Sequence, residues 1–592
     1  MKKLALILIS IVIIFCLSAC TDNNGDNTVD NQTSANTENE LENLHTEQVT
    51  TAPQTEQVTT PTHTEHDFTA ADCETPKTCK TCGATEGEAL GHKEGEWFVS
   101  KEASADNDGT KTLPCTVCGK ALKEESIPAI RVSKKLDYAI NEDGATCTIT
   151  GIGKCKDIEI YIPETIDGYT VTAIERGAFW GNTQITYVDI PDSVTDIGYG
   201  AFQACDKLEK VKLSANLESI GEFAFAHSKK LESIGDIPDS VTSIGKKAFE
   251  YCESLTALKL SSSITTIEEN AFAYCRSITS VVIPNSVTNI GKKAFEGCRN
   301  LAEVDIGTGV VTIGDEAFSF CTKLSSFDIP DNVTSVGTRV LFKCTSLNNV
   351  NLGKGLSEIS DSMFHGCTSL AEIDIPDNIS KICHHAFYEC TSLDNVKIPE
   401  GVTAIEFYTF YMCENLKSIT IPNSVTRIEE GAFYDCYALS VIDLPDNLIT
   451  IGTHAFYYTD LKTLEIPNTV TSIGSRAFQF CDKLESVNIP SGLTVIEEAT
   501  FSACNISSIV IPDSVTHIGA SAFAGCKLTS VEMPASVVKI GNRAFSSNDE
   551  LTSIKFGGTV EQWNNSSVHE FFALSTPVTK VICSNGEVAI TK

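Results

Sequence analysis

The chain has 592 residues, 42% of them hydrophobic, and a formal net charge of −34 at pH 7. So acidic a chain is a poor partner for nucleic acids and for anionic membrane surfaces, because both present negative groups that need basic side chains. The same charge favours solubility and opposes nonspecific self-association, so a monomer is expected.

The first twenty residues have the pattern of an export signal. Two lysines precede an apolar run, Leu4 to Phe15, which is too short to span a bilayer as a stable helix. The run is followed by small residues directly before Cys20, which resembles the lipobox of bacterial lipoproteins. We therefore predict a lipoprotein signal peptide at 1–20, with Cys20 lipidated and the rest exposed at the cell surface, attached to the membrane only through this anchor. An ordinary secretory signal with an incidental cysteine is the alternative.

Residues 21–65 are predicted to be a disordered tether. They are rich in Asp, Asn, Thr, Glu and Gln and nearly lack aromatic and aliphatic side chains. Such a stretch buries too little apolar surface to offset the chain entropy that folding removes. It would hold the folded part of the protein away from the membrane.

A small cysteine-rich module is predicted at 66–130. Its two knuckles are Cys79-Lys-Thr-Cys82-Gly and Cys115-Thr-Val-Cys118-Gly. In such a turn, glycine lets the chain bend so that both sulfurs face one point. Four thiolates suit a tetrahedral structural Zn²⁺, so our first prediction is a zinc ribbon with ligands Cys79, Cys82, Cys115 and Cys118. A metal would also help so small a module to fold.

Two other arrangements of these cysteines remain open. An exported chain reaches a compartment where disulfides form, so each knuckle could be oxidised instead. A rival metal site lies within the first half of the module, with His66, Cys73, Cys79, Cys82 and His92 as candidate ligands. A catalytic zinc is disfavoured, because four thiolates leave no open coordination position.

Most of the remaining sequence is one short repeat. An apolar residue closes each Leu-x-x-Val-x-Ile run, and the step to the next is 23 residues almost everywhere, once 24 and three times 22. A fixed period of this length is typical of a solenoid, in which turns too small to fold alone bury one continuous core. The closing residues are Ile190, Leu213, Ile237, Leu260, Ile283, Ile306, Ile329, Leu352, Ile375, Ile398, Ile421, Leu444, Ile466, Ile489, Ile511, Met533 and Phe556.

The parts of each turn have separate roles. Leu301, Val304 and Ile306 have the alternation of a short strand, and their side chains are predicted to face inward. A proline often ends the strand, and the Asp or Asn after it suits a turn bonded to its own backbone. Val-Thr-x-Ile returns along a second face. Ala-Phe-x-x-Cys is expected to form one short helical turn that directs its phenylalanine into the core.

The cysteine of each turn recurs at one repeat position. Equivalent positions point the same way, which is poor disulfide geometry, and a buried thiol behaves as a small apolar side chain. Three turns have Ser228, Thr459 and Asn548 there instead, all small. We therefore interpret these cysteines as packing residues, with metal clustering or redox sensing as the alternative.

The signature Ile-Pro-(Asp/Asn)-x-Val-Thr-x-Ile-Gly-x-x-Ala-Phe-x-x-Cys-x-x-Leu resembles the BspA-type leucine-rich repeats of bacterial surface proteins. The resemblance covers roughly residues 136–592. It implies a right-handed coil with parallel strands and short helical turns. It also implies a surface adhesin or antigen that binds proteins of a host or a neighbouring cell.

Both ends of the solenoid are predicted to be capped. We place an N-terminal cap at 131–189, the solenoid at 190–556 and a C-terminal cap at 557–592. A cap is needed because the terminal turn would otherwise expose its core edge. The turn signals Asn141-Glu-Asp-Gly144 and Ser584-Asn-Gly586 predict a hairpin in each cap.

One exposed strand position carries Asp305, Asp328, Asn351 and Asp374 on successive turns. Stacked carboxylates at strand spacing repel one another unless something lies between them. A solvated face that tolerates the repulsion is the simpler interpretation. A strip that binds a cation or a basic partner is the alternative.

The sequence contains no pattern that requires catalysis. His569-Glu570 begins like the helix of a zinc protease but lacks the second histidine. The predicted function is recognition of, or adhesion to, extracellular or cell-surface proteins, because a long surface with variable exposed positions suits large partners. A passive spacer or envelope scaffold is the alternative. A group of tyrosines favours binding, namely Tyr408, Tyr411, Tyr434, Tyr437, Tyr457 and Tyr458.

Overall fold

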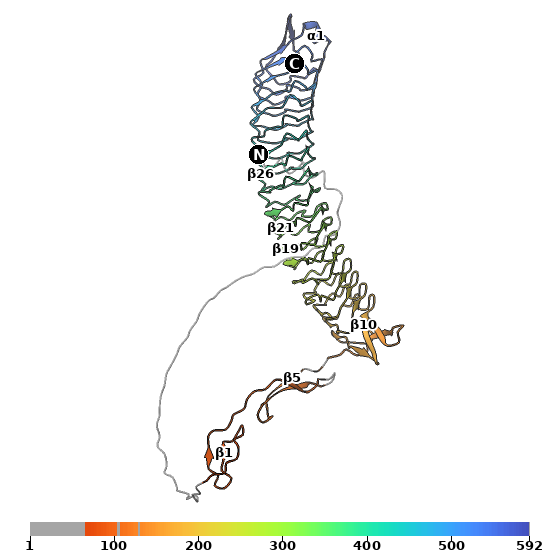
Figure 1. Ribbon diagram of the computed structural model, residues 1–592. Helices are drawn as coiled ribbons and strands as arrows, with labels where there is room; N and C mark the ends of the chain where they lie inside the picture. Colours follow the sequence, from red (N-terminus) through yellow and green to blue (C-terminus); the bar gives the residue numbers. More distant parts are fainter. Residues whose placement is uncertain (1–64, 104–106, 128, 130, 591–592) are drawn as a thin grey trace, which may run out of the picture. The chain divides into compact units, whose positions relative to one another are not determined.

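The computed structural model describes residues 65–103, 107–127, 129 and 131–590 (Figure 1). The predicted signal peptide with Cys20, and the predicted tether up to its last residue, lie outside the described residues. Within the part that the structure describes, no helix has the length and apolarity needed to cross a membrane.

The described chain forms two compact units. Residues 65–96 and 113–123 make up the first, and residues 97–112 with 124–590 make up the second. The predicted module of residues 66–130 is therefore divided between them.

The first unit contains both knuckles. Around the first knuckle, β1 (Lys77–Thr78) pairs antiparallel with β2 (Thr85–Glu86). Gly83 and Gly119 have φ angles of 74° and 73°, a left-handed conformation that glycine adopts without steric cost. Each glycine donates its N–H to the carbonyl of the first cysteine of its knuckle at 2.9 Å. The bend predicted for Cys-x-x-Cys-Gly is confirmed in both knuckles.

The second unit holds the solenoid and its caps. Ahead of the N-terminal cap, one sheet contains β3 (Phe98–Lys101), β4 (Gly109–Pro114) and β5 (Ala121–Ile127).

The N-terminal cap is built on the predicted hairpin. In it, β6 (Asp137–Ile140) pairs antiparallel with β7 (Thr146–Gly151). β7 pairs in parallel with β10 (Tyr169–Ile174), which also takes the short β9 (Thr165–Ile166) on its edge. The hairpin thus covers the open edge of the first turns.

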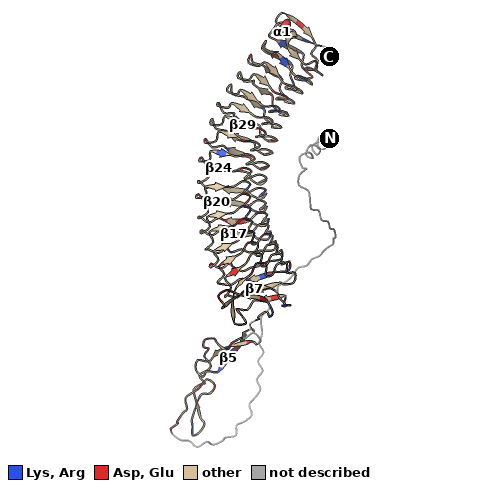
Figure 2. Cartoon of the chain, turned by 90° about the vertical axis from the view of Figure 1, so that its right-hand side faces the viewer, with Lys and Arg blue, Asp and Glu red and all other residues tan. Residues whose placement is uncertain are grey.

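Beyond the cap, parallel strands of successive turns form two ladders, and the stack of turns follows a gentle curve (Figure 2). Leu-x-x-Val-x-Ile makes the first ladder and Val-Thr-x-Ile the second. Each residue pairs with its equivalent one turn later, as Val281 does with Val304 and Ile290 with Ile313. The predicted solenoid of parallel strands is confirmed.

The strands of the first ladder are β8 (Glu159–Tyr161), β11 (Tyr187–Asp189), β13 (Lys210–Lys212), β17 (Ser280–Val282), β19 (Glu303–Asp305), β21 (Ser326–Asp328), β23 (Asn349–Asn351), β26 (Asn395–Lys397), β28 (Ser418–Thr420), β31 (Thr463–Leu464), β33 (Ser486–Val487), β35 (Ser508–Val510), β37 (Ser530–Met533), β39 (Ser553–Phe556) and β41 (Lys580–Cys583). Those of the second, after β10, are β12 (Asp196–Ile197), β14 (Ser219–Ile220), β15 (Ser243–Ile244), β16 (Thr266–Ile267), β18 (Asn289–Ile290), β20 (Thr312–Ile313), β22 (Ser335–Val336), β24 (Glu358–Ile359), β25 (Lys381–Ile382), β27 (Ala404–Ile405), β29 (Arg427–Ile428), β30 (Thr450–Ile451), β32 (Ser472–Ile473), β34 (Val495–Ile496), β36 (His517–Ile518), β38 (Lys539–Ile540) and β40 (Ser567–Val568).

The Ala-Phe-x-x-Cys segments are hydrogen-bonded turns and not the short helical turn that we predicted, because left-handed residues flank each phenylalanine. Their N–H groups alternate between two kinds of acceptor. Ala294 donates to Gly291 within its own turn, whereas the next residue, Phe295, donates to Ala317 of the following turn at 2.8 Å. These segments therefore form a third hydrogen-bonded connection between turns, which leaves few backbone groups unpaired.

This alternation depends on two left-handed residues in each turn. In one turn they are Lys293 and Gly297, with φ angles of 57° and 70°. Most of the equivalent residues are not glycine, such as Lys247 and Tyr251 with φ angles of 57° and 59°. Because a left-handed residue with a side chain costs roughly 1–2 kcal/mol, the bonds to the next turn must offset this strain.

The core is a column of phenylalanines, as predicted. From Phe179 to Phe318, and again from Phe364 to Phe545, successive rings stack with centroids 5.0–5.6 Å apart. Leu341 interrupts the column. Its neighbour Phe318 instead takes an edge-on contact from Phe327, at 5.0 Å.

The Asp or Asn after the proline acts differently from our prediction. Asn285 Oδ1 accepts a hydrogen bond from the N–H of Thr308, one turn later, at 2.9 Å. Asp239 Oδ1 accepts from Ser262 in the same way. These side chains therefore connect neighbouring turns and do not close their own, because the backbone N–H that they reach lies 23 residues away.

The repeated cysteines are buried free thiols with a specific hydrogen bond. Cys298 Sγ donates to the carbonyl of Phe272 in the preceding turn at 3.2 Å. Burial raises the pKa of Cys298 to about 12, so its thiol stays protonated. Two replacements keep a donor to the equivalent carbonyl: Ser228 Oγ bonds Phe202 at 2.8 Å, and the Asn548 side chain bonds Phe523 at 2.9 Å. The third replacement, Thr459, donates to Phe456 of its own turn instead. The position therefore favours a small side chain that carries a hydrogen-bond donor.

The C-terminal cap contains α1 (Val560–Asn565), whose capping box joins Thr559 and Gln562. Trp563 is buried and lies 5.3 Å from the ring of Phe556, so the helix covers the end of the core. The predicted hairpin follows, with β41 antiparallel to β42 (Gly586–Ala589).

The role of the thiol predicts different effects for two substitutions. Cys298→Ala should lower the free energy of unfolding by about 1 kcal/mol, because the bond to Phe272 is lost. Cys298→Ser should cost less, since serine already occupies this position at residue 228. Urea unfolding of both variants, followed by circular dichroism, measures the difference. Equal losses would show that the position requires size and not a donor.

Candidate metal centres and binding faces

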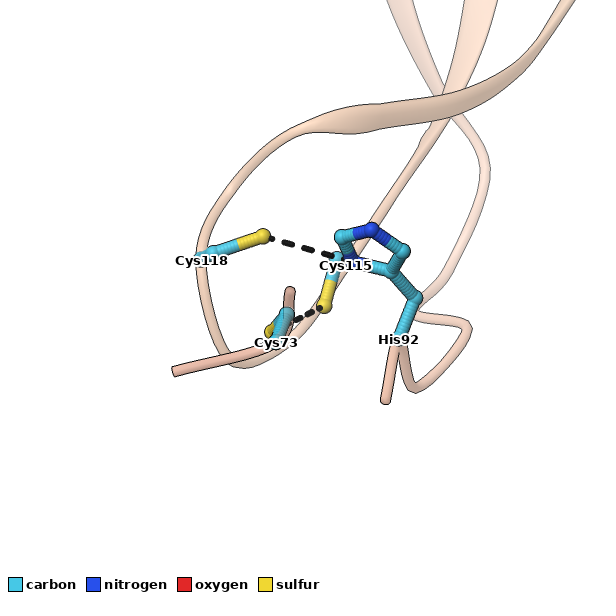
Figure 3. Close-up of side chains that lie close together, drawn as sticks. All are labelled: Cys73, His92, Cys115 and Cys118. Carbon is cyan, nitrogen blue, oxygen red and sulfur yellow. Dashed lines mark hydrogen bonds between the residues drawn. The ribbon is translucent and has the colours of Figure 1, made fainter. Parts of the chain in front are cut away.

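The second knuckle belongs to a cluster of four candidate ligands. Cys73, His92, Cys115 and Cys118 converge so that one ligand atom from each lies within 4.8 Å of all the others (Figure 3). The sulfurs of Cys73 and Cys115 are 3.6 Å apart, and Cys118 Sγ lies 3.6 Å from His92 Nδ1. Cys73 and Cys115 are buried, while the other two are exposed.

The first knuckle belongs to a separate cluster. Cys79 and Cys82 gather with His66, and Cys82 Sγ lies 3.4 Å from His66 Nδ1. This cluster supplies three candidate ligands among the described residues.

The structure therefore does not bring the predicted ligands Cys79, Cys82, Cys115 and Cys118 together. Each knuckle instead lies beside the histidine that precedes it, because an isolated β-bridge joins its first cysteine to a residue two positions after that histidine. Phe68 bridges Cys79, and Glu94 bridges Cys115. The rival set is matched in part. His66 joins the first knuckle, whereas Cys73 and His92 complete the second.

The four-residue cluster fits a tetrahedral metal. With Zn–S bonds of about 2.3 Å, two sulfurs of one tetrahedron are roughly 3.8 Å apart. The 3.6 Å between Cys73 and Cys115 is close to this spacing. Three thiols and one imidazole are also a ligand set common at structural zinc sites.

The surroundings of this cluster favour the thiolate form of one cysteine, Cys115. Burial opposes ionisation of Cys115, yet hydrogen bonds from the N–H groups of Cys118 and Val117, and from His92, lower its pKa. Burial and the neighbouring thiols raise the pKa of Cys73. A bound divalent cation would offset the effect of burial and of the neighbouring thiols, since it favours the deprotonated form of every ligand.

The predicted acidic strip lies along the exposed side of the first ladder. Asp305, Asp328, Asn351 and Asp374 are all exposed and occupy the same repeat position in successive turns. Six other turns carry opposite charges at this position and form the ion pairs Asp189–Lys212, Asp236–Lys259 and Glu532–Lys555. Asp443 and Glu465 are a second pair of adjacent carboxylates in the same column. Within the strip no lysine or arginine stands in the column.

The strip lines a shallow groove of about 490 Å³. Asp305, Asp328 and Asn351 form its floor together with Asp331 and neighbouring backbone. The groove is open to solvent and polar, so it suits an extended basic segment better than a small apolar ligand.

The predicted tyrosine cluster is confirmed and is longer than expected. Tyr388, Tyr411, Tyr434 and Tyr457 follow the core phenylalanines on successive turns and stack with centroids 4.4–4.9 Å apart. His365 continues the column at 4.3 Å from Tyr388. All five side chains are partly exposed or close to the surface, so this side of the solenoid is aromatic where the strand side is acidic.

A family model identifies the repeat. The model of the BspA type leucine rich repeat region matches residues 172–301, 265–391, 357–485 and 471–585. No curated protein matches the chain. A solved leucine-rich repeat protein from Bacteroides ovatus is 24% identical, covers 72% of this chain and 99% of its own, and has a TM-score of 0.43. A leucine rich cell surface protein from Faecalibacterium prausnitzii is 27% identical over 74% of this chain and 98% of its own, with a TM-score of 0.30.

Proposed function

Because the chain belongs to the BspA-type leucine-rich repeat family, we propose that it binds other proteins at a cell surface through the strand side of its solenoid. Proteins of this type are cell-surface proteins, and leucine-rich repeat proteins generally bind proteins and are typically not enzymes. The finer proposal is adhesion to macromolecules of a host or a neighbouring cell.

The observation that carries this proposal is the uncompensated acidic strip. Asp305 and Asp328 stand on adjacent turns and form no ion pair among the described residues, unlike the oppositely charged pairs of other turns. Asp374 lies one turn beyond Asn351 and is followed in the column by Lys397. Like charges on adjacent strands destabilise a sheet, so a basic partner would gain from binding there.

The strip gives a test of recognition. The full-length chain is exposed to immobilised extracellular-matrix and plasma proteins and to bacterial cells, with and without calcium and at two salt concentrations. We expect saturable binding to at least one partner, weakened severalfold by high salt and by Asp328→Asn combined with Asp374→Asn.

The control removes the same charge elsewhere. Asp549 and Glu550 are exposed in a turn, so Asp549→Asn with Glu550→Gln should leave binding unchanged. An equal loss in both double variants would indicate net charge alone. Absence of saturable binding to every surface would favour the scaffold.

We also propose export and lipidation at Cys20. The charged start, the short apolar run and the small residues before the cysteine support it. Cells that express the chain should incorporate labelled palmitate into it, and Cys20→Ala should abolish the label. A wild-type chain that is secreted without label would contradict the lipid anchor.

We further propose a structural zinc held by Cys73, His92, Cys115 and Cys118. Bound zinc would cross-link two segments of a unit that has few buried apolar residues, because the ligands come from both of its parts. Among the described residues, the cluster of His66, Cys79 and Cys82 offers three ligands, and it is expected to hold metal more weakly.

Metal content separates these ligand sets. The reduced full-length chain, equilibrated with zinc and dialysed, should retain zinc, and Cys73→Ser should lose about one equivalent. Cys155→Ser serves as the control, because this half-buried cysteine lies outside both clusters. Retention of zinc by Cys73→Ser together with loss by Cys79→Ser would favour the four-cysteine site. A reduced wild-type chain without zinc would refute the metal.

A further inference from the structure

One carboxylate on the turn side of the solenoid is enclosed by tyrosines. Asp435 lies two residues after the core Phe433, in a left-handed conformation with φ of 58°. Its Oδ1 is buried and makes no hydrogen bond, and no ion pair is formed by its carboxylate among the described residues. The residue as a whole remains partly exposed.

The surrounding rings leave an aromatic face turned toward this carboxylate. Tyr458 occupies the position of Asp435 one turn later, and Phe480 stacks on it from the next turn, with centroids 4.7 Å apart. Because Phe480 covers that face, the other face of Tyr458 is turned to the turn of Asp435. Tyr437 adds a second ring, in edge-on contact with Tyr458 at 6.3 Å. Tyr437 and Tyr458 are exposed by 38% and 41%.

We propose that Asp435, Tyr437 and Tyr458 form a binding site for an alkylammonium cation. A carboxylate supplies the opposite charge, and a tyrosine face attracts a cation through its quadrupole. The cation is either the side-chain ammonium of a lysine or a trimethylammonium headgroup, since both carry a positive charge that a carboxylate and a tyrosine face attract. The net charge of −34 would draw any such cation toward the chain.

A bound cation would explain why the fold contains the Asp435 carboxylate, which destabilises the unliganded protein. A carboxylate with an enclosed, unbonded oxygen costs free energy unless something compensates its charge. Burial raises the pKa of Asp435 to about 6, Glu414 adds to the rise, and the Tyr437 hydroxyl opposes it. The other ionisable groups that face it are Tyr411, Tyr434, Tyr457 and Tyr458, whose pKa values burial raises, so they stay neutral near pH 7.

Titration of the full-length chain with two cations tests the site. The probes are choline and N-acetyl-lysine amide, and 3,3-dimethyl-1-butanol is the neutral isostere of choline. At pH 8 we expect saturable calorimetric binding of at least one cation and none of the isostere. Binding of only one cation identifies the source of the ammonium, and binding of both supports the site equally.

Variants assign the binding to these residues. Asp435→Asn and Tyr458→Ala should each weaken it at least tenfold. Glu389→Gln is the matched control, because Glu389 has the same repeat position and the same left-handed backbone two turns earlier, and it should bind as the wild type does. Absence of cation binding, or binding unchanged in Asp435→Asn, would overturn the proposal. Neither result bears on the acidic strip, which lies on the strand side.

The pH dependence gives a second measurement. Lowering the pH from 8 to 5 passes the pKa of Asp435, so about nine tenths of the carboxyl groups become protonated and binding should weaken about tenfold. The raised pKa also means that the charged carboxylate destabilises the folded state above about pH 6. Asp435→Asn should therefore raise the unfolding midpoint at pH 8, and this gain should vanish below about pH 4. A midpoint that falls at pH 8 would show that the carboxylate is structural.

Discussion

The structure depends on hydrogen bonds between turns that lie one repeat apart. Each turn is only one chain thick and has no second layer to satisfy its backbone, so its N–H and C=O groups must find partners on the adjacent turns. Two strand ladders meet part of this need, and the alternating bonds of the Ala-Phe-x-x-Cys turns meet the rest. Side chains add to the same network: Asn285 reaches the next turn, and Cys298 reaches the preceding one.

This network leaves the exposed positions free to vary. The inward positions of each turn are fixed by the phenylalanine column and by the residues around it, whereas the outward strand position accepts Asp, Lys, Asn or Val without change of backbone. A long surface can thus carry different chemistry on its two sides. One side presents the acidic strip from Asp305 to Asp374, and the other presents the tyrosine column from Tyr388 to Tyr457.

The first unit is stabilised in a different way from the solenoid. It has few buried apolar side chains, and three of them, Cys73, Cys79 and Cys115, are cysteines. Such a unit gains little from the hydrophobic effect and needs a cross-link to hold its segments together. The convergence of two knuckles with two histidines provides two places for such a link.

The sequence by itself determined the period, the parallel strands, the phenylalanine column and both capping hairpins. These features follow from patterns within 23 residues, because apolar spacing and turn residues act locally. It also located the acidic strip and most of the aromatic cluster, since a repeat register places equivalent residues side by side.

Where no repeat aligns the residues, only the tertiary structure decided which of them lie together. In the first unit no periodicity relates Cys73 to Cys115, so the grouping of the ligands depends on how the chain crosses itself. In the solenoid, the left-handed positions carry ordinary side chains such as Lys293 and gave no local signal. The environment of Asp435 likewise arises from Tyr458 and Phe480 on later turns, because burial and unmet hydrogen bonds are properties of neighbours in space.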